Sequence, residues 1–107
     1  MQEEVDKIFI HDVIYNYIAE LIAKTRQHPM LELGVSRRGA LFLDRMAKAH
    51  AYLDGRDYVT GEDVQAVFCD VCAHRVILSQ EARLEAKSAQ DVLQDLLRRV
   101  DVPDRKL

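Results

Sequence analysis

The chain has 107 residues, a mass of 12.3 kDa and a net charge of -3, which suits one domain and excludes a multidomain enzyme. Hydrophobic residues make up 49% of it, and only 4 Gly and 2 Pro are present, so we expect an ordered fold of long helices. The negative charge provides no overall positive field for nucleic acid or an anionic membrane. No apolar run approaches the roughly 20 residues that cross a bilayer, and the acidic start is unlike a secretory signal. We therefore expect a cytoplasmic protein without membrane insertion.

Apolar side chains recur at helical spacing in four segments, of which the first contains Ile14, Tyr17, Leu21 and Thr25. This helix is predicted to end before His28-Pro29. In front of it, residues 8–10 form a short β-favouring run. Two partners are open for that run, namely residues 58–59 and residues 76–78.

The second helix is predicted to begin at Ser36, whose hydroxyl suits an amino-terminal cap, and to run to about Leu53. Asp54-Gly55 then stops it. Apolar or small side chains lie nearly all round this segment, with a polar strip on its middle turns. We therefore expect it to be the central helix of the domain.

Two further helices begin with a hydroxyl residue followed three positions later by an acid, a pattern typical of a capping box. These pairs are Thr60 with Asp63, and Ser88 with Asp91 before Pro103. The charged segment 81–87 between them is either a loop or an irregular helical turn. The predicted fold is an all-α bundle of four helices, to which a minimal β-bridge remains an open addition.

The segment Gly34-Val35-Ser36-Arg37-Arg38-Gly39 places two arginines in the first turn of a helix. Each cation there costs about 0.3 to 1 kcal/mol at an exposed site, because a helix amino terminus is itself positive. Two interpretations remain open. Either the side chains simply extend into water, or the free N–H groups and guanidinium groups together bind a phosphate supplied from elsewhere.

Other motifs favour structural roles. Gly34 and Gly39 have phosphate-loop spacing, but Ala40-Leu41 stands where the loop requires Lys and Ser or Thr, so the chain alone should not hydrolyse a nucleotide. Cys69 and Cys72 lie within a helix without a second ligand pair, which favours buried thiols over zinc. We expect the four histidines to lie at the surface or to cap helices. Arg26 and His74-Arg75 are expected at helix carboxyl ends, where a cation is favourable. Residues 54–64 are expected to end one helix, form a turn and cap the next.

Taken together, these segments resemble the carboxyl-terminal lid domain of AAA+ ATPases, most closely the MoxR family. The resemblance runs from about residue 12 to residue 103, and in the family a Gly-Ala-Ser-Pro-Arg-Ala box carries the sensor 2 arginine, to which Arg38 corresponds. This chain departs from the box at Val35, Arg37 and Gly39. Four ordered motifs carry the resemblance: Tyr17-Ile18 with residues 25–29, residues 34–39, residues 55–60 with Asp63-Val64, and His74-Arg75.

The resemblance implies that residues 1–11 lead in from an ATPase core, that residues 12–103 form the lid and that residues 104–107 are a tail. It implies that the parent protein binds ATP and Mg²⁺ and that the isolated chain binds neither. In the parent protein, Ser36, Arg37 and Arg38 would contact the nucleotide, and Arg38 would be the catalytic residue. Implied partners are the parent's own N-terminal core, neighbouring subunits of a ring and a von Willebrand factor A-domain protein, without nucleic acid. MoxR-like ATPases are regarded as chaperones that assemble or activate complexes.

Two alternatives from other classes remain. A long helix followed by Arg56-Asp57-Tyr58-Val59-Thr60 and a short capped helix also resembles the second half of a histone fold. In that case Arg37, Arg38, Arg45 and Lys48 would meet nucleic-acid phosphates, although the acidic balance disfavours it. The other alternative is a free-standing helical protein-interaction domain.

Overall fold

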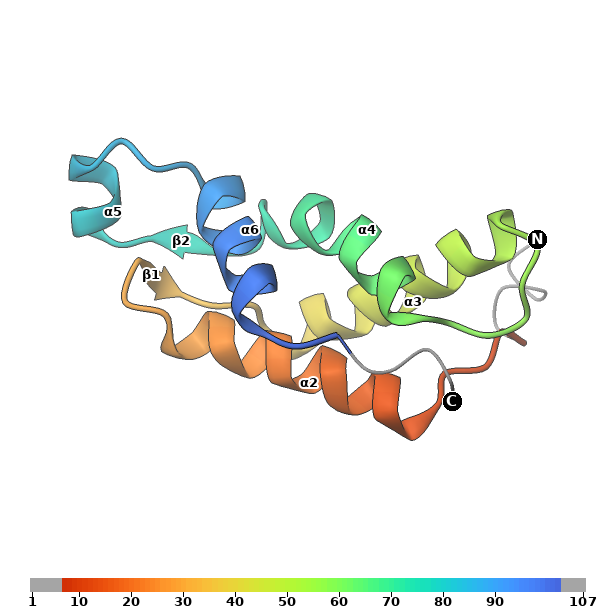
Figure 1. Cartoon of the computed structure of the whole chain (residues 1–107). Coiled ribbons are helices and arrows are strands. Elements are labelled where there is room, and N and C mark those ends of the chain that lie inside the picture. The colour runs from red at the N-terminus through yellow and green to blue at the C-terminus, as the bar shows by residue number, and fades with distance from the viewer. Residues whose placement is uncertain (1–6, 103–107) are drawn as a thin grey trace.

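The computed structural model describes residues 7–102, which form helices joined by short connections (Figure 1). The all-α class is confirmed, as are the four long helices predicted from sequence. The segment 81–87, left open between loop and helical turn, overlaps a further short helix of five residues. In chain order the elements are α2 (Asp12–Gln27), β1 (Leu31–Leu33), α3 (Arg37–Leu53), α4 (Gly61–Cys72), β2 (Ile77–Leu78), α5 (Gln80–Leu84) and α6 (Ala89–Arg99).

Two small β pairings complete the fold. Phe9 forms a parallel bridge with Tyr58, so the first of the two predicted partners of residues 8–10 is the correct one. Residues 77–78 instead pair antiparallel with β1, which the sequence pattern did not predict. The β1–β2 ribbon and α5 lie at one end of the molecule, and the loop between α3 and α4 lies at the other (Figure 1).

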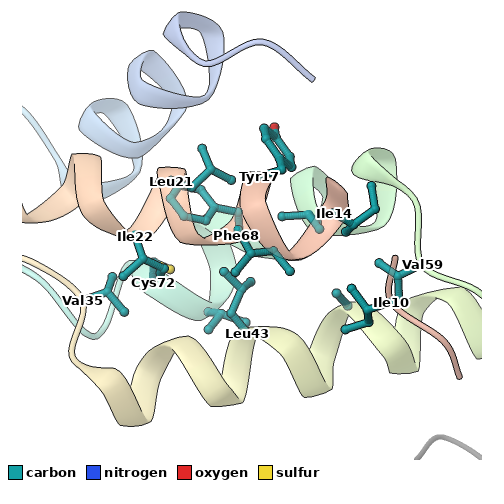
Figure 2. Close-up of a cluster of buried hydrophobic side chains, with 14 of the residues drawn as sticks. Ile10, Ile14, Tyr17, Leu21, Ile22, Val35, Leu43, Val59, Phe68 and Cys72 are labelled. Atoms are coloured by element: carbon teal, nitrogen blue, oxygen red, sulfur yellow. The ribbon is translucent and has the colours of Figure 1, made fainter. Parts of the chain in front are cut away.

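The hydrophobic core lies where α2, α3 and α4 face one another. Figure 2 shows labelled side chains from these three helices converging in one cluster. α6 adds Leu93 and Leu96, which are both fully or almost fully buried. Ile8 and Ile10 are buried in the same core, so the segment that precedes α2 packs onto the bundle.

The sequence predicts α3 to be the central helix because apolar or small side chains lie nearly all round it, but in the structure its buried residues all lie on one side. It buries one stripe, made of Gly39, Leu43, Ala47 and Ala51, and α4 packs against it more extensively than any other described element does. On the opposite side, the Leu41 side chain is 64% exposed. Mainly small residues form the buried stripe, which lets α4 approach closely, while larger apolar side chains remain outside.

The predicted helix starts are confirmed. Capping boxes are present at Thr60 with Asp63 and at Ser88 with Asp91, in each case with both reciprocal hydrogen bonds. Each box satisfies N–H groups that have no partner inside the helix. These local bonds explain why the two helix starts are readable from sequence.

A polar network ties the loop between α3 and α4 to both helices. The buried Asp63 carboxylate of α4 accepts hydrogen bonds from Arg56 Nη1 at 2.6 Å and Nη2 at 2.7 Å. His50 of α3 also lies 2.6 Å from it, through Nδ1. The structural role predicted for residues 54–64 is confirmed, and His50 takes part in it rather than serving as an isolated surface residue.

Candidate functional site at the amino end of α3

The amino end of α3 holds the residues predicted to bind an anion. Ser36 caps the helix, and its Oγ accepts a hydrogen bond from the Gly39 N–H at 3.2 Å. Arg37 and Arg38 follow as the first two helical residues, with both side chains exposed. The first turn contains no acid, and Arg38 forms no ion pair within residues 7–102. Two positive side chains thus remain uncompensated beside the positive end of a helix dipole.

An open groove of about 480 Å³ lies beside this helix end. Its walls come from the last turn of α2, from β1 with the loop that follows it, and from the segment after α4. Arg26, Glu32, Ser36, His74 and Arg75 are among the lining residues. Of the three predicted site residues, the structure therefore brings Ser36 to the groove, whereas Arg37 and Arg38 lie outside its lining.

The basic residues of the groove were assigned from sequence only to helix carboxyl ends. Arg26 does lie in the last turn of α2, and its Nε donates to the Val35 carbonyl oxygen at 3.0 Å. His74 and Arg75 come directly after α4, and the Arg75 guanidinium lies 4.6 Å from the centroid of the Phe42 ring. The family resemblance was the one sequence signal that could have marked these residues as part of a site, since Arg26 and His74-Arg75 belong to its motifs. That they line the same groove depends on tertiary packing.

Val35 and Gly39, two of the departures from the family box, are in direct contact. A Cβ atom added to Gly39 would lie 2.8 Å from Val35 Cγ1 and 3.0 Å from Arg75 Cδ. The Val35 side chain is almost completely buried, so it has little room to move. The larger residue at position 35 and the smaller one at position 39 therefore compensate each other.

We expect the effect of Gly39→Ala on stability to change sign with residue 35. Beside Val35 the new methyl group should destabilise the chain by about 1 kcal/mol or more, because overpacking outweighs the gain in helix propensity. In a Val35→Ala background the same change should stabilise it by up to about 1 kcal/mol, since the contact with Val35 Cγ1 is gone and only the long, flexible side chain of Arg75 has to shift. Urea unfolding of the four variants measures this coupling.

Gly55 supplies the matched control. Its φ of +80° disfavours a side chain, yet nothing lies within 4 Å of an added Cβ. Gly55→Ala should therefore destabilise the chain equally with Val or Ala at position 35. An equal effect of Gly39→Ala in both backgrounds would contradict the compensation.

The cysteines behave largely as the buried thiols that were predicted. Cys72 is fully buried, and burial raises the pKa of its thiol to about 12. Cys69 is only half-buried. Within residues 7–102, no three His, Cys, Asp or Glu side chains form a group that could hold a metal ion. In the same range, every helix is too short or too polar to cross a bilayer.

Comparison with known proteins identifies the class. The family model described as AAA lid domain matches residues 23–96, a range that contains the last turn of α2, all of α3 and the groove. This range is more than half of the chain, so the chain belongs to the AAA lid domain family. This class differs from both the histone-fold-like module and the free-standing interaction domain considered as alternatives.

Relatives narrow the assignment. The chain is 40% identical over 103 residues to the uncharacterized protein YeaC of Bacillus subtilis, covering 96% of this chain and 32% of YeaC. It is 45% identical over 71 residues to the protein MoxR of Methylorubrum extorquens, covering 66% of this chain and 20% of that protein. It is also 30% identical to chaperone MoxR1 of Mycobacterium tuberculosis, over 96% of this chain and 30% of MoxR1.

A solved structure agrees with these relatives. A protein of Cytophaga hutchinsonii described as a candidate ATPase superposes with a TM-score of 0.88 and 34% identity, over 95% of this chain and 34% of that chain. The domain is thus the C-terminal lid of a MoxR-family AAA+ ATPase, as the sequence motifs indicated. It spans about a third of the length of YeaC and of this structure.

Proposed function

We propose that this lid senses the nucleotide of its parent ATPase through Arg38, acting as the sensor 2 arginine at the γ-phosphate. The observation that carries the proposal is the pair of exposed arginines without an acidic partner at the amino end of α3. A polyphosphate would turn this unfavourable placement into a favourable one, because its negative charge would face both the guanidinium groups and the helix dipole. The alternative, arginines that merely extend into water, predicts no effect on turnover.

The residues at this helix end fit a phosphate group. The N–H groups in the first turn of an α-helix have no backbone partner within the helix. At the start of α3, Ser36 Oγ accepts a hydrogen bond from one of them, the Gly39 N–H. Arg38 would hold the γ-phosphate, while Ser36 and Arg37 would lie at the nucleotide beside it. ATP would supply the charge that this end of the helix lacks, and Mg²⁺ would be held by the ATPase core rather than by the lid.

The outer face of α3 supports a core domain as the partner. Arg38, Leu41 and Arg45 follow one another at intervals of three and four residues, so they lie on one side of the helix. All three side chains are exposed within the described domain. If Arg38 reaches a nucleotide bound to the core, Leu41 and Arg45 on the following turns face the same partner.

Loss of the γ-phosphate on hydrolysis would remove the charge that Arg38 binds. The lid would then shift relative to the core, and this shift would relay the nucleotide state to neighbouring subunits of a ring. For the parent protein we propose a chaperone role in assembling or activating complexes, with a von Willebrand factor A-domain protein as a partner. The description of one relative as chaperone MoxR1 supports the first part of this proposal.

Arg38→Ala in the full-length ATPase tests the proposed function. We expect ATP turnover to fall about 100-fold, the usual loss when one preorganised donor to a developing charge is removed. The fold should be unchanged, because the Arg38 side chain is exposed and makes no ion pair in residues 7–102. Steady-state kinetics and the thermal midpoint of each variant measure the two effects.

Arg98→Ala is the matched control, since Arg98 is an exposed arginine in the last turn of α6, far along the chain from α3. It removes the same charge and should leave turnover unchanged. Arg37→Ala, measured beside it, separates the contribution of the first arginine from that of the second. Normal turnover in Arg38→Ala would refute the assigned role.

A further inference from the structure

Two side chains from the last turn of α2 bind the backbone N–H and the backbone carbonyl of Val35, the residue that precedes the cap of α3. Thr25 Oγ1 accepts a hydrogen bond from the Val35 N–H at 3.1 Å and donates one to the Ile22 carbonyl oxygen at 2.6 Å. On the other side of the same residue, Arg26 Nε donates to the Val35 carbonyl oxygen at 3.0 Å. Ser36, the cap of α3, is the next residue along the chain.

Close backbone packing reinforces these bonds at Gly34. A Cβ atom on Gly34 would lie 2.7 Å from the Arg26 N and Cα atoms and from the Thr25 carbonyl carbon. Those are backbone atoms of a helix, so they could not move aside as a flexible side chain would. The loop before α3 is therefore seated directly on the backbone of α2, and we name this contact of Thr25, Arg26, Gly34 and Val35 the α2 clamp.

Thr25 is the informative member of the α2 clamp. It is completely buried, and Val35 is 1% exposed, so their hydrogen bond is shielded from water and the Val35 N–H has no solvent to replace Thr25. Burial also means that Thr25 cannot touch a nucleotide. Arg26, in contrast, lines the groove and is able to meet a ligand directly.

We propose that Thr25 is a positioning residue for Arg38: by bonding Val35 it sets where α3 begins, and thus where the first turn presents its guanidinium group. This inference rests on the proposed function of Arg38. Only two residues separate Val35 from Arg38, so a displacement of the loop would pass directly into the first turn of the helix. A displacement of about 1 Å at a site of this kind costs up to about 100-fold in rate.

Thr25→Val in the full-length ATPase tests the inference, because valine keeps the shape of threonine but cannot bond the Val35 N–H. We expect kcat to fall about tenfold, and Thr25→Ser, which retains the hydroxyl, to recover most of that loss. In an Arg38→Ala background, Thr25→Val should lower turnover no further, since the group it positions is absent. A purely structural role would not depend on Arg38 in this way.

Thr60, the only other threonine of the chain, gives the matched control. Thr60→Val removes the hydroxyl that caps α4, in the loop beyond the opposite end of α3. It should lower the thermal midpoint as Thr25→Val does, yet leave kcat unchanged. If Thr25→Val does not fold, Arg26→Met removes the other side-chain donor to Val35. Because Arg26 also lines the groove, only the part of its effect on kcat that disappears in the Arg38→Ala background supports positioning, and an effect of the same size in both backgrounds contradicts it.

The outcomes separate the two proposals. Normal turnover in Arg38→Ala refutes the sensor role and, with it, the positioning role of Thr25. Low turnover in Arg38→Ala together with normal turnover in Thr25→Val overturns the positioning role alone. A loss caused by Thr25→Val that is equally large with and without Arg38 overturns it as well, because the effect would then reach turnover by another route.

Discussion

Replacing Asp63 with alanine is expected to lower the free energy of unfolding by about 3 kcal/mol, the lower end of the cost of removing one partner from a buried ion pair, because Arg56 is partly exposed and keeps Asp54 as a partner. Asp63 is fully buried and accepts from Arg56 and from the Thr60 N–H, with His50 in contact as well. The alanine variant would leave the Thr60 N–H without its side-chain acceptor, and Arg56 would keep only Asp54 and the Tyr58 carbonyl oxygen as partners. Urea unfolding followed by circular dichroism measures the loss.

Asp91 is the matched control, because it holds the same capping-box position at the start of α6 but is exposed. Asp91→Ala removes a cap without removing a buried carboxylate from a network of donors, so its cost should be much smaller. Equal losses in the two variants would show that capping, and not the buried network, accounts for the role of Asp63.

The pH dependence provides a second readout of Asp63. Burial raises the pKa of this carboxyl, but hydrogen bonds from Arg56, Thr60 and His50 outweigh burial and hold the pKa at about 2, below the ordinary aspartate value of 3.8. The folded state therefore binds a proton less readily than the unfolded chain. The resulting stabilisation, about 2 kcal/mol, is complete above the unfolded pKa and is lost as the pH falls from about 5 to about 2. This loss should be absent from Asp63→Ala.

Replacing Phe68 with alanine is expected to destabilise the domain by about 3–5 kcal/mol, because the cavity adds to the lost transfer free energy. Phe68 lies on α4 and is completely buried, in the cluster that also contains Leu21 of α2 and Leu43 of α3 (Figure 2). Such a loss is a large part of the 5–15 kcal/mol typical of a domain. Thermal and urea unfolding of the chain measure it.

Phe9→Ala controls for the loss of an aromatic ring, since the Phe9 side chain is 57% exposed. Its cost should be clearly smaller, because less apolar surface returns to water and no closed cavity forms. A loss as large as that of Phe68→Ala would contradict the placement of the core between α2, α3 and α4.

The site was only partly predictable. Ser36 as a cap with Arg37 and Arg38 in the following turn was readable from sequence, because one hydroxyl and its position before a helical pattern determine that geometry. The groove was not predicted, since its lining residues Arg26 and Arg75 are separated by α3 and α4 along the chain. Its formation depends on how those helices pack.

The sequence by itself determined the four long helices, the caps of three of them and the family, because helix starts and stops depend on bonds within about four residues and the family motifs lie in order along the chain. Only the tertiary structure decided that Leu41 stays exposed on α3, that β1 pairs with β2 and that Thr25 and Arg26 hold Val35. An apolar pattern shows which faces are able to be buried. Which face is buried, and against what, follows from contacts between segments distant in the chain, which no local pattern encodes.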